Sequence, residues 1–327
     1  MTDRATPDKI PLLIDTDPGV DDALALLMAF ASPAHDVIGL TIAAGNVGLA
    51  HTVRNALKLC EVAEVGVPVF AGAEAPLLHP ARDAAFVHGE DGFGDIGYAT
   101  PHRAADGEHA ALAILRLSHA HAGRLLLVAL APLTNVALAL KLDPTLPQRI
   151  DRLVVMGGAV TAHGNMTAAA EFNIAFDPEA AHLVLSAFPR IELVDWEAVV
   201  RHAVPHEALD AWLAADTPRA RFYDAISRAT RARAEERRGG RWPAADPLAM
   251  AVALQPDGAR EWLERPLAVE LAGVHTRGAT VVDWRREGGD RDNAAILMAY
   301  DQARFEALLR EALAVPADGL RRVATSG

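Results

Sequence analysis

Short apolar segments alternate with longer segments of helical periodicity along the first two thirds of the chain. Parallel sheets produce this order, because each strand is buried on both faces and a helix joins it to the next strand. The pattern therefore predicts an α/β fold with a mostly parallel, doubly wound sheet and helices on both faces. The expected strands are Leu12–Asp15, Val37–Ala43, Val67–Phe70, Leu125–Leu130, Arg152–Met156 and Ile191–Val194, and the expected helices are Val20–Ala31, Val47–Ala63, Glu108–His119, Leu133–Leu140 and Pro178–Ser186.

The last third of the chain has a different pattern. A helical segment, Pro205–Arg238, and the helix Pro247–Leu254 precede three apolar runs and a closing helix, Gln302–Ala314. The three runs predict a small antiparallel C-terminal addition. No repeat and no linker rich in Pro, Gly or Ser interrupts the chain, so we expect residues 1–327 to form a single domain. The apolar runs are Leu267–Leu271, Thr280–Trp284 and Ala294–Met298.

Charge and composition exclude several classes of protein. Hydrophobic residues make up 51% of the 327 residues, which is typical of a globular chain, and the net charge of −12 argues against nucleic acid or an anionic membrane surface as a partner. The single cysteine, Cys60, rules out an internal disulfide and is expected to pack in a helix. The longest uncharged apolar stretch, Leu125–Leu140, contains Pro132, which argues against a membrane span. The N-terminus has no secretory signal pattern, so we expect a cytoplasmic protein.

Four aspartates, Asp15, Asp17, Asp21 and Asp22, lie within eight residues directly after the first expected strand. Burying so many like charges would cost several kcal/mol each unless something neutralises them. A hard divalent cation prefers oxygen ligands and would remove that cost. These acids could instead cap the following helix, but capping accounts for one or two of them. The cluster therefore favours a metal-dependent enzyme.

Further polar residues follow the other expected strands, at the edge where open parallel sheets bind ligands. They are acids and amides without lysine or arginine, which favours a neutral polyhydroxyl ligand such as a sugar over a phosphate. Asp177 and Asp246 each precede a proline, as helix N-caps do. Capping is sufficient to explain Asp177, whereas a functional role of Asp246 stays open on this pattern alone. The polar residues at the strand ends are Asn46, Thr134, Asn135, Asn165, Glu171 and Asn173.

Several segments match a known family in their order along the chain. The segment Asp15–Ala23 (DTDPGVDDA) resembles the N-terminal signature of the nucleoside hydrolases of the inosine–uridine-preferring superfamily. The resemblance implies hydrolysis of the N-glycosidic bond of ribonucleosides to ribose and free nucleobase, a role in purine or pyrimidine salvage, and a homodimer or homotetramer. Later segments that resemble family motifs are Thr41–Asn46, Ala131–Val136, Gly164-Asn165, Ala170–Ile174, Asp246–Ala249 and Thr276–Trp284.

The resemblance also implies roles for individual residues. A Ca²⁺ ion would be held by Asp17, Asp22, Asp246 and the backbone carbonyl of Thr134, and Asp17 would act as general base on a calcium-bound water that attacks the anomeric carbon. Asp15 would orient the neighbouring ligands. His88, in a glycine-rich flap, matches a family histidine near the base. The residues implied to bind the ribose hydroxyls are Asp21, Asn46, Asn165, Glu171 and Asn173.

One position departs from the family pattern. Ala245 stands where many members have a histidine that protonates the departing base, a contribution of roughly 10²–10⁴-fold. His88 or a residue of Arg231–Trp242 could supply the acid instead, or the enzyme could prefer a purine or activated base stacked on Trp242. The charged run Arg228–Arg241 is more simply a solvated helix face than a lid over the base.

Two other functions remain open at this point. Without an acid at position 245 the chain could be a non-catalytic or weakly active riboside-binding protein. Asp15-Thr-Asp17 also resembles the Asp-x-Asp motif of aspartyl phosphohydrolases. That chemistry needs a lysine near the phosphate, and the two candidates, Lys58 and Lys141, fall in expected helices.

Overall fold

The computed structural model describes residues 8–80, 82–238, 240–289 and 291–314, with the backbone alone for residues 235–238. Within these residues one large sheet has the strand order β3-β2-β1-β4-β5-β6-β12-β9. All neighbouring strands in it are parallel except β12 and β9, which pair antiparallel. The strands are β1 (Ile10–Thr16), β2 (His35–Ile42), β3 (Val69–Ala71), β4 (Leu125–Ala129), β5 (Ile150–Met156), β6 (Ile191–Val194), β9 (Ala259–Arg265) and β12 (Ala294–Tyr300).

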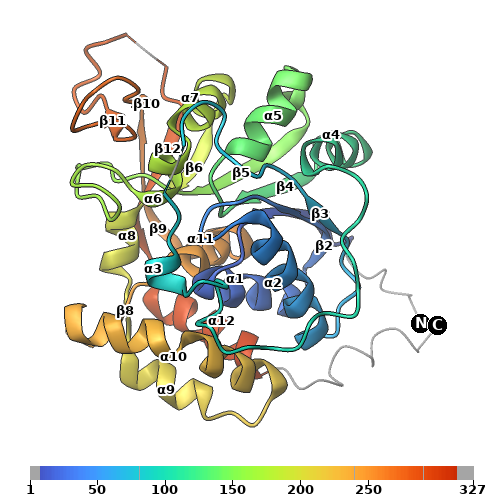
Figure 1. Cartoon of the computed structure of the whole chain (residues 1–327). Coiled ribbons are helices and arrows are strands. Elements are labelled where there is room, and N and C mark those ends of the chain that lie inside the picture. The colour runs from blue at the N-terminus through green and yellow to red at the C-terminus, as the bar shows by residue number, and fades with distance from the viewer. Residues whose placement is uncertain (1–7, 81, 239, 290, 315–327) are drawn as a thin grey trace, which may run out of the picture.

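Helices cover both faces of this sheet, and each face has its own hydrophobic core (Figure 1). Successive residues of β1 show the division, since Leu12 and Ile14 belong to one core and Leu13 belongs to the other. The helices of the first core are α1 (Val20–Ala31), α2 (Leu49–Val62), α8 (Trp196–Arg201), α9 (His206–Leu213), α10 (Pro218–Arg238), α11 (Ala245–Leu254) and α12 (Gln302–Ala314), and those of the second are α4 (Ala110–Ala120), α5 (Thr134–Leu142) and α7 (Pro178–Ala187).

Shorter elements complete the described chain. Helices α3 (Ala85–His88) and α6 (Phe172–Phe176) lie in the connections that follow strands β3 and β5. Two-stranded antiparallel ladders join β7 (Val204–Pro205) to β8 (Arg241–Trp242) and β10 (Leu267–Val269) to β11 (Thr280–Val282), and 3₁₀ helices span Leu146–Gln148 and Pro256–Gly258. No described helix is long and apolar enough to cross a membrane.

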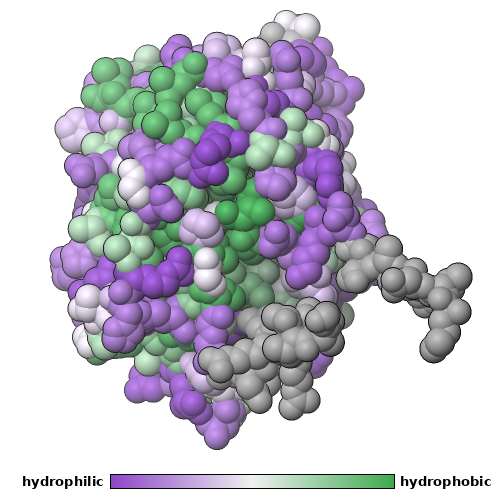
Figure 2. All heavy atoms as spheres, turned by 90° about the vertical axis from the view of Figure 1, so that its right-hand side faces the viewer, coloured by the Kyte–Doolittle hydropathy of each residue, from purple (hydrophilic) through white to green (hydrophobic). Residues whose placement is uncertain are grey.

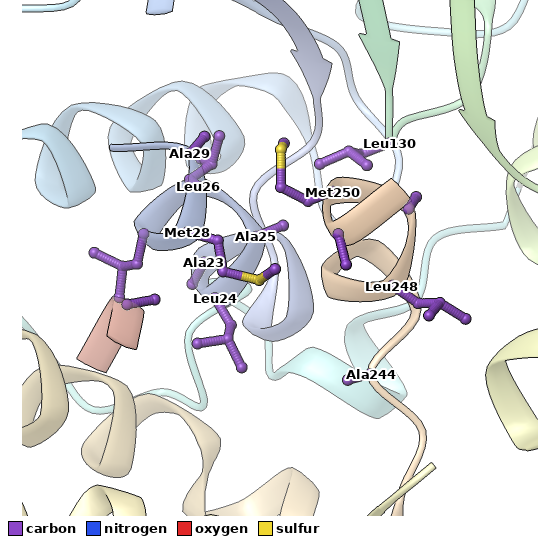
Figure 3. Close-up of a cluster of buried hydrophobic side chains, with 14 of the residues drawn as sticks. Ala23, Leu24, Ala25, Leu26, Met28, Ala29, Leu130, Ala244, Leu248 and Met250 are labelled. Atoms are coloured by element: carbon purple, nitrogen blue, oxygen red, sulfur yellow. The ribbon is translucent and has the colours of Figure 1, made fainter. Parts of the chain in front are cut away.

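Helices α1 and α11 pack side by side beneath the sheet (Figure 3). Ala23, Ala25 and Ala29 of α1 are buried in the first core, and Leu248 and Met250 of α11 enter the same core. Nearly every residue of both helices is buried. This packing places the N-termini of two helices next to each other, at the carboxyl end of β1.

The sequence prediction of the fold is confirmed, with one correction at the C-terminal end. The run Ala294–Met298 was expected in a separate antiparallel addition, but β12 joins the main sheet parallel to β6. The antiparallel edge strand is β9, Ala259–Arg265, which the sequence pattern did not indicate because its residues are half-exposed and mostly charged or polar. The β10–β11 pair is antiparallel as expected. A single domain over residues 1–327 stays a prediction.

Hydrophobic and hydrophilic residues are interspersed on the face shown in Figure 2, with hydrophobic ones gathered mainly in its upper part and centre. Large apolar side chains that are exposed come from distant parts of the chain, among them Leu78, Leu142 and Val274. Scattered apolar residues are normal on a protein surface. The homodimer or homotetramer implied by the sequence therefore stays a prediction.

Candidate active site

A cavity of about 240 Å³ opens at the carboxyl ends of the parallel strands. Its lining combines acids and amides with aromatic and apolar side chains. This combination suits a ligand with a polar sugar and a flat apolar ring. The polar residues are Asp21, Asn46, His88, Asn165, Glu171, Asn173, Thr230, Arg233 and Asp246, and the others are Ala84, Phe86, Val87, Leu130, Met156, Met166, Phe172, Trp196, Ala234, Trp242, Pro243 and Ala245.

Asn46 joins two of the buried aspartates beneath this cavity. Its side-chain amide donates to Asp22 Oδ2 at 2.9 Å, and its backbone N–H donates to Asp17 Oδ2 at 2.7 Å. The N–H of Gly19 also donates to Asp22 Oδ2 at 3.0 Å, so Asp22 does take part in capping helix α1. The other oxygen of Asp17, Oδ1, is buried without a hydrogen-bond partner.

Carboxylate oxygens of Asp21, Asp22 and Asp246 lie within 4.8 Å of one another. Burial raises the pKa of Asp21 to about 6 and raises that of Asp17 well above its ordinary value, with the charge of Asp22 adding to the second shift. Burial and the charges of Asp21 and Asp22 likewise raise the pKa of Asp246. Crowded acids with unpartnered oxygens at Asp17 and Asp21 fit a hard cation with oxygen ligands. The identity of that cation as Ca²⁺ stays a prediction.

Helix capping does not explain Asp246. Helix α11 begins at Ala245, one residue before the expected cap, and no side chain caps it. Asp177, in contrast, caps α7 as expected, since its Oδ1 accepts the N–H of Ala180 at 3.0 Å. Packing of α11 against α1 therefore brings Asp246 to the aspartates that follow β1, although the sequence separates them widely.

Leu130 lines the cavity, and Thr134, the predicted source of a backbone ligand, does not. The hydroxyl of Thr134 donates to Asp177 Oδ2 at 2.7 Å, and the residue opens helix α5, whose backbone carbonyls point along the helix axis. Leu130 follows β4 directly and lines the cavity, and its carbonyl accepts the side-chain amide of Asn173 at 2.7 Å. Leu130, a residue that the motif comparison did not single out, thus lines the cavity, whereas Thr134 does not.

The predicted sugar-binding residues Asn46, Asn165, Glu171 and Asn173 lie together on the cavity wall, with Asp21 beside them. Glu171 caps helix α6, because its carboxylate accepts the N–H groups of Asn173 at 3.0 Å and Ile174 at 3.2 Å. Burial raises its pKa to about 7. These contacts hold Glu171 and Asn173 rigidly, which favours a fixed set of partners for hydroxyl groups.

Asp15 lies outside the cavity lining. Its Oδ1 accepts hydrogen bonds from Thr41 at 2.7 Å and from Asn135 at 2.9 Å, and its Oδ2 is buried without a partner. Burial raises its pKa to about 7. This position agrees with an orienting role beneath the other acids, which stays a prediction.

His88 is held neutral at the cavity edge. Its Nδ1 accepts the backbone N–H of Val20 at 3.1 Å, so the proton of the neutral ring is on Nε2. Burial lowers its pKa to about 4. Near neutral pH, His88 can therefore donate a hydrogen bond but does not supply the proton of an imidazolium.

Helix α10 contributes to the cavity, contrary to the simpler expectation for the charged run Arg228–Arg241. Thr230 and Arg233 line the cavity, and so does Trp242 beyond the helix. The expectation that no lysine or arginine is present is therefore wrong for Arg233. Its Nη1 donates to the carbonyl of Phe86 at 2.6 Å, and Thr230 Oγ1 donates to that of Val87 at 3.0 Å. Both contacts join α10 to α3, the helix of the glycine-rich flap (Figure 1).

Several cavity residues were not predicted. Trp196 lies two residues after the end of β6, so its position near a strand end could have identified it. Phe86, Met166 and Phe172 flank predicted site residues, but an apolar side chain carries no sequence signal that separates a cavity residue from a core residue. Ala245, which stands where many family members have a histidine, does line the cavity.

Comparison with known proteins agrees with this geometry. Residues 12–307 match the family described as inosine-uridine preferring nucleoside hydrolase. The inosine-uridine preferring nucleoside hydrolase of Crithidia fasciculata is 33% identical over 92% of this chain and 96% of its own length. The non-specific ribonucleoside hydrolase RihC of Salmonella enteritidis PT4 is 35% identical over 93% of this chain and 97% of its own.

Solved structures agree as well. A plant nucleoside hydrolase, the PpNRh1 enzyme, superposes with a TM-score of 0.88 at 29% identity, covering 94% of this chain and 100% of that one. An inosine-guanosine nucleoside hydrolase superposes with a TM-score of 0.86 at 31% identity, covering 94% and 99%. As the sequence motifs predicted, the chain belongs to the inosine-uridine preferring nucleoside hydrolase family.

Proposed function

We propose that this protein hydrolyses the N-glycosidic bond of ribonucleosides, with Asp17 as the general base. The observation that carries the proposal is the unpartnered Oδ1 of Asp17, buried beneath a cavity that also gathers the predicted sugar-binding residues. Family membership supports the reaction class, nucleoside hydrolysis. The site residues and the cation are our own assignment.

The cation is proposed to be Ca²⁺, held by Asp17, Asp22 and Asp246, with Asp21 close enough to contribute an oxygen. For the backbone ligand we favour the carbonyl of Leu130 over that of Thr134, because Leu130 lines the cavity. When bound, such a cation lowers the pKa of a water and fixes its position. It also neutralises the acid cluster, which supports its requirement for activity.

The protein residues then divide the remaining work. Asp17 takes a proton from the attacking water, whose oxygen forms a bond to the anomeric carbon of the ribose. The bond between that carbon and the base nitrogen breaks, and its electron pair leaves with the base, which gains a proton. Asp21, Asn46, Asn165, Glu171 and Asn173 are proposed to bind the ribose hydroxyls and stabilise the oxocarbenium-like transition state.

Departure of the base is proposed to rely on stacking and hydrogen bonding. Phe86, Phe172, Trp196 and Trp242 supply aromatic surface, and neutral His88 offers an Nε2–H. Ala245 has no titratable group that could protonate the departing base. We therefore expect purine or otherwise activated bases, which leave more easily, to be better substrates than uracil.

Incubating the purified protein with inosine, guanosine, adenosine, uridine and cytidine in millimolar Ca²⁺, and measuring free ribose, tests this proposal. Release of ribose from the purine nucleosides, abolished by EDTA and restored by Ca²⁺, is the expected result. Absence of ribose from every nucleoside, with the fold intact by circular dichroism, would contradict it.

Ala245 lines the cavity and cannot donate a proton to the base, which supports one alternative: a riboside-binding protein with little turnover. Calorimetry distinguishes the two, because binding of a nucleoside without release of ribose on a timescale of hours supports the alternative. The aspartyl phosphohydrolase is less favoured, since Lys58 and Lys141 lie in helices α2 and α5 and line no part of the cavity.

A further inference from the structure

The loop after strand β5 carries two cavity residues, Asn165 and Met166, yet most of its residues between 161 and 169 are exposed. It folds on itself through backbone contacts, such as the N–H of Met166 to the carbonyl of Ala170 at 3.1 Å. Its early part leaves the sheet, so its backbone N–H groups need other partners. The contacts that attach this loop to the rest of the protein therefore determine the position of the Asn165 side chain.

Glu197 of helix α8 is the acceptor for several of these groups. Its Oε2 accepts the N–H of Val160 at 2.8 Å, and its Oε1 accepts the N–H of Thr161 at 2.9 Å. Oε1 also accepts the Thr161 hydroxyl at 2.7 Å and, more weakly, the N–H of His163 at 3.4 Å. One carboxylate thus accepts from three residues of the loop, Val160, Thr161 and His163.

The charge state of Glu197 strengthens these contacts. Its neighbour Asp195 accepts the N–H of Ala198 at 2.9 Å and caps α8, and burial together with Glu197 raises the pKa of Asp195 to about 8. Burial alone would raise the pKa of Glu197, but hydrogen bonds from Asp195 and Thr161 lower it. The proton of the pair is thus held by Asp195, and Glu197 binds the loop as an anion. Charge-assisted hydrogen bonds are about twice as strong as neutral ones.

The held loop presents one free polar group. Asn165 Oδ1 accepts the N–H of Phe172 at 2.9 Å, which fixes the side chain between the loop and helix α6. Its amide nitrogen has no hydrogen-bond partner among the described residues, and Asn165 lines the cavity. That nitrogen is available to donate to a ligand hydroxyl.

We infer that Glu197 is a positioning residue for ribose binding, which acts by anchoring residues 160–163 so that Asn165 reaches the sugar. This inference rests on the proposed function for the role of Asn165. It makes two separable statements: Glu197 holds the loop, and the held loop sets affinity for the ribose through Asn165.

A double-mutant cycle tests the second statement. Asn165→Ala and Glu197→Gln each are expected to raise KM for a purine ribonucleoside about tenfold, with a smaller fall in kcat, because the contact to the ribose is made in the ground state as well as in the transition state. The amide introduced at position 197 cannot accept from both Val160 and Thr161, so the anchor is weakened. If Glu197 acts through Asn165, the double variant resembles either single variant, whereas independent effects multiply. Multiplied effects, or a wild-type KM in Glu197→Gln, would overturn the inference.

Glu192→Gln is the matched control. Glu192 is a buried carboxylate on the adjoining strand β6, but its Oε2 pairs with Arg152 at 2.6 Å, away from the loop. This control is expected to lower Tm while leaving KM unchanged in both the wild-type and the Asn165→Ala background. A rise in its KM equal to that of Glu197→Gln would assign the effect to general destabilisation.

Hydrogen exchange of peptides covering residues 157–171 tests the first statement without any reliance on catalysis. Faster exchange in Glu197→Gln than in Glu192→Gln supports the anchor. Equal exchange in the two variants overturns it. If no ribonucleoside is hydrolysed, the proposed function fails while the exchange result still decides the anchor, and titration with ribose replaces KM.

Discussion

The side-chain amide of Asn46 donates to Asp22 Oδ2 at 2.9 Å, while the backbone N–H of Asn46 holds Asp17 Oδ2 at 2.7 Å. Asn46, in the connection after β2, thus orients two acids that follow β1. Asn46→Ala removes the first contact and keeps the second. We expect a loss of about 1–3 kcal/mol of stability and a clear rise in KM, because Asp22 Oδ2 keeps only the Gly19 donor and the Asp17 carbonyl loses the Asn46 amide. Urea unfolding and steady-state kinetics measure the two effects, and unchanged values for both would contradict the role of Asn46.

Asp17→Asn is expected to reduce kcat by several orders of magnitude, because an amide cannot take a proton from water. Calorimetric binding of a ribose analogue should persist, since the proposed sugar contacts remain. Asp15→Asn is the control: Asp15 is equally buried, but its carboxylate accepts from Thr41 and Asn135 and not from Asn46, so its loss of activity should be much smaller. Similar losses in the two variants would argue against Asp17 as the base.

Calcium and protons are expected to compete for the acid cluster. Because the pKa of Asp21 is raised to about 6 and those of Asp17, Asp22 and Asp246 are also raised, the affinity for Ca²⁺ should fall as the pH drops through about 6. Isothermal titration with Ca²⁺ at pH 5, 6, 7 and 8 measures this dependence. An affinity independent of pH would separate the cation from these acids.

The calcium-free protein should become less stable as the pH rises from 5 to 8. Acids in salt bridges, which have lowered pKa values, produce the opposite trend. The pKa values of Asp15 and Glu171 are raised by burial to about 7 in the folded protein, so the folded state binds protons more tightly than the unfolded state. Their contribution is present below the unfolded values near 4 and is lost as the pH rises through about 7. In EDTA, Tm should therefore be higher at pH 5 than at pH 8, and Ca²⁺ should reduce the difference. A higher Tm at pH 8 in EDTA would contradict this assignment.

Ala245→His is expected to increase hydrolysis of uridine more than that of inosine. Ala245 lines the cavity beside Trp242, so a histidine there could protonate the base that leaves less readily. We expect a gain in kcat/KM for uridine of roughly 10-fold or more, within the range of general acid catalysis. Ala245→Asn, which adds a polar group without a titratable ring, is the control. Equal gains for the two variants would show that proton transfer is not the cause.

Contact between α10 and the flap should affect substrate affinity. Thr230→Val keeps the shape of the side chain but removes the donor to the Val87 carbonyl. We expect a KM about three- to tenfold higher and faster hydrogen exchange over residues 84–89, as the flap opens more often. Arg228→Ala, on the same helix but exposed and paired with Asp224, is expected to change neither. No difference between the two variants would contradict the role of Thr230.

The cavity shows where sequence reasoning succeeds and where it stops. Asp21, Asn46 and Glu171 could be placed because each follows an expected strand, and parallel strands bring their carboxyl ends to one edge. Arg233 could not, since a charged helix that lines a cavity has the same local pattern as one that faces solvent. The edge strand β9 escaped notice for a related reason: half-exposed, charged residues do not produce an apolar run.

The amino-acid sequence alone determined the parallel sheet, the acids that follow its first strand and the family, because those depend on local periodicity and contiguous motifs. Only the tertiary structure decided that Asp21 joins Asp22 and Asp246, that Leu130 rather than Thr134 lines the cavity, and that Glu197 holds the loop of Asn165. The physical reason is that these contacts arise from the packing of distant surfaces, such as those of α1 and α11. Complementary shapes of that kind do not produce a periodic pattern of residues in the sequence.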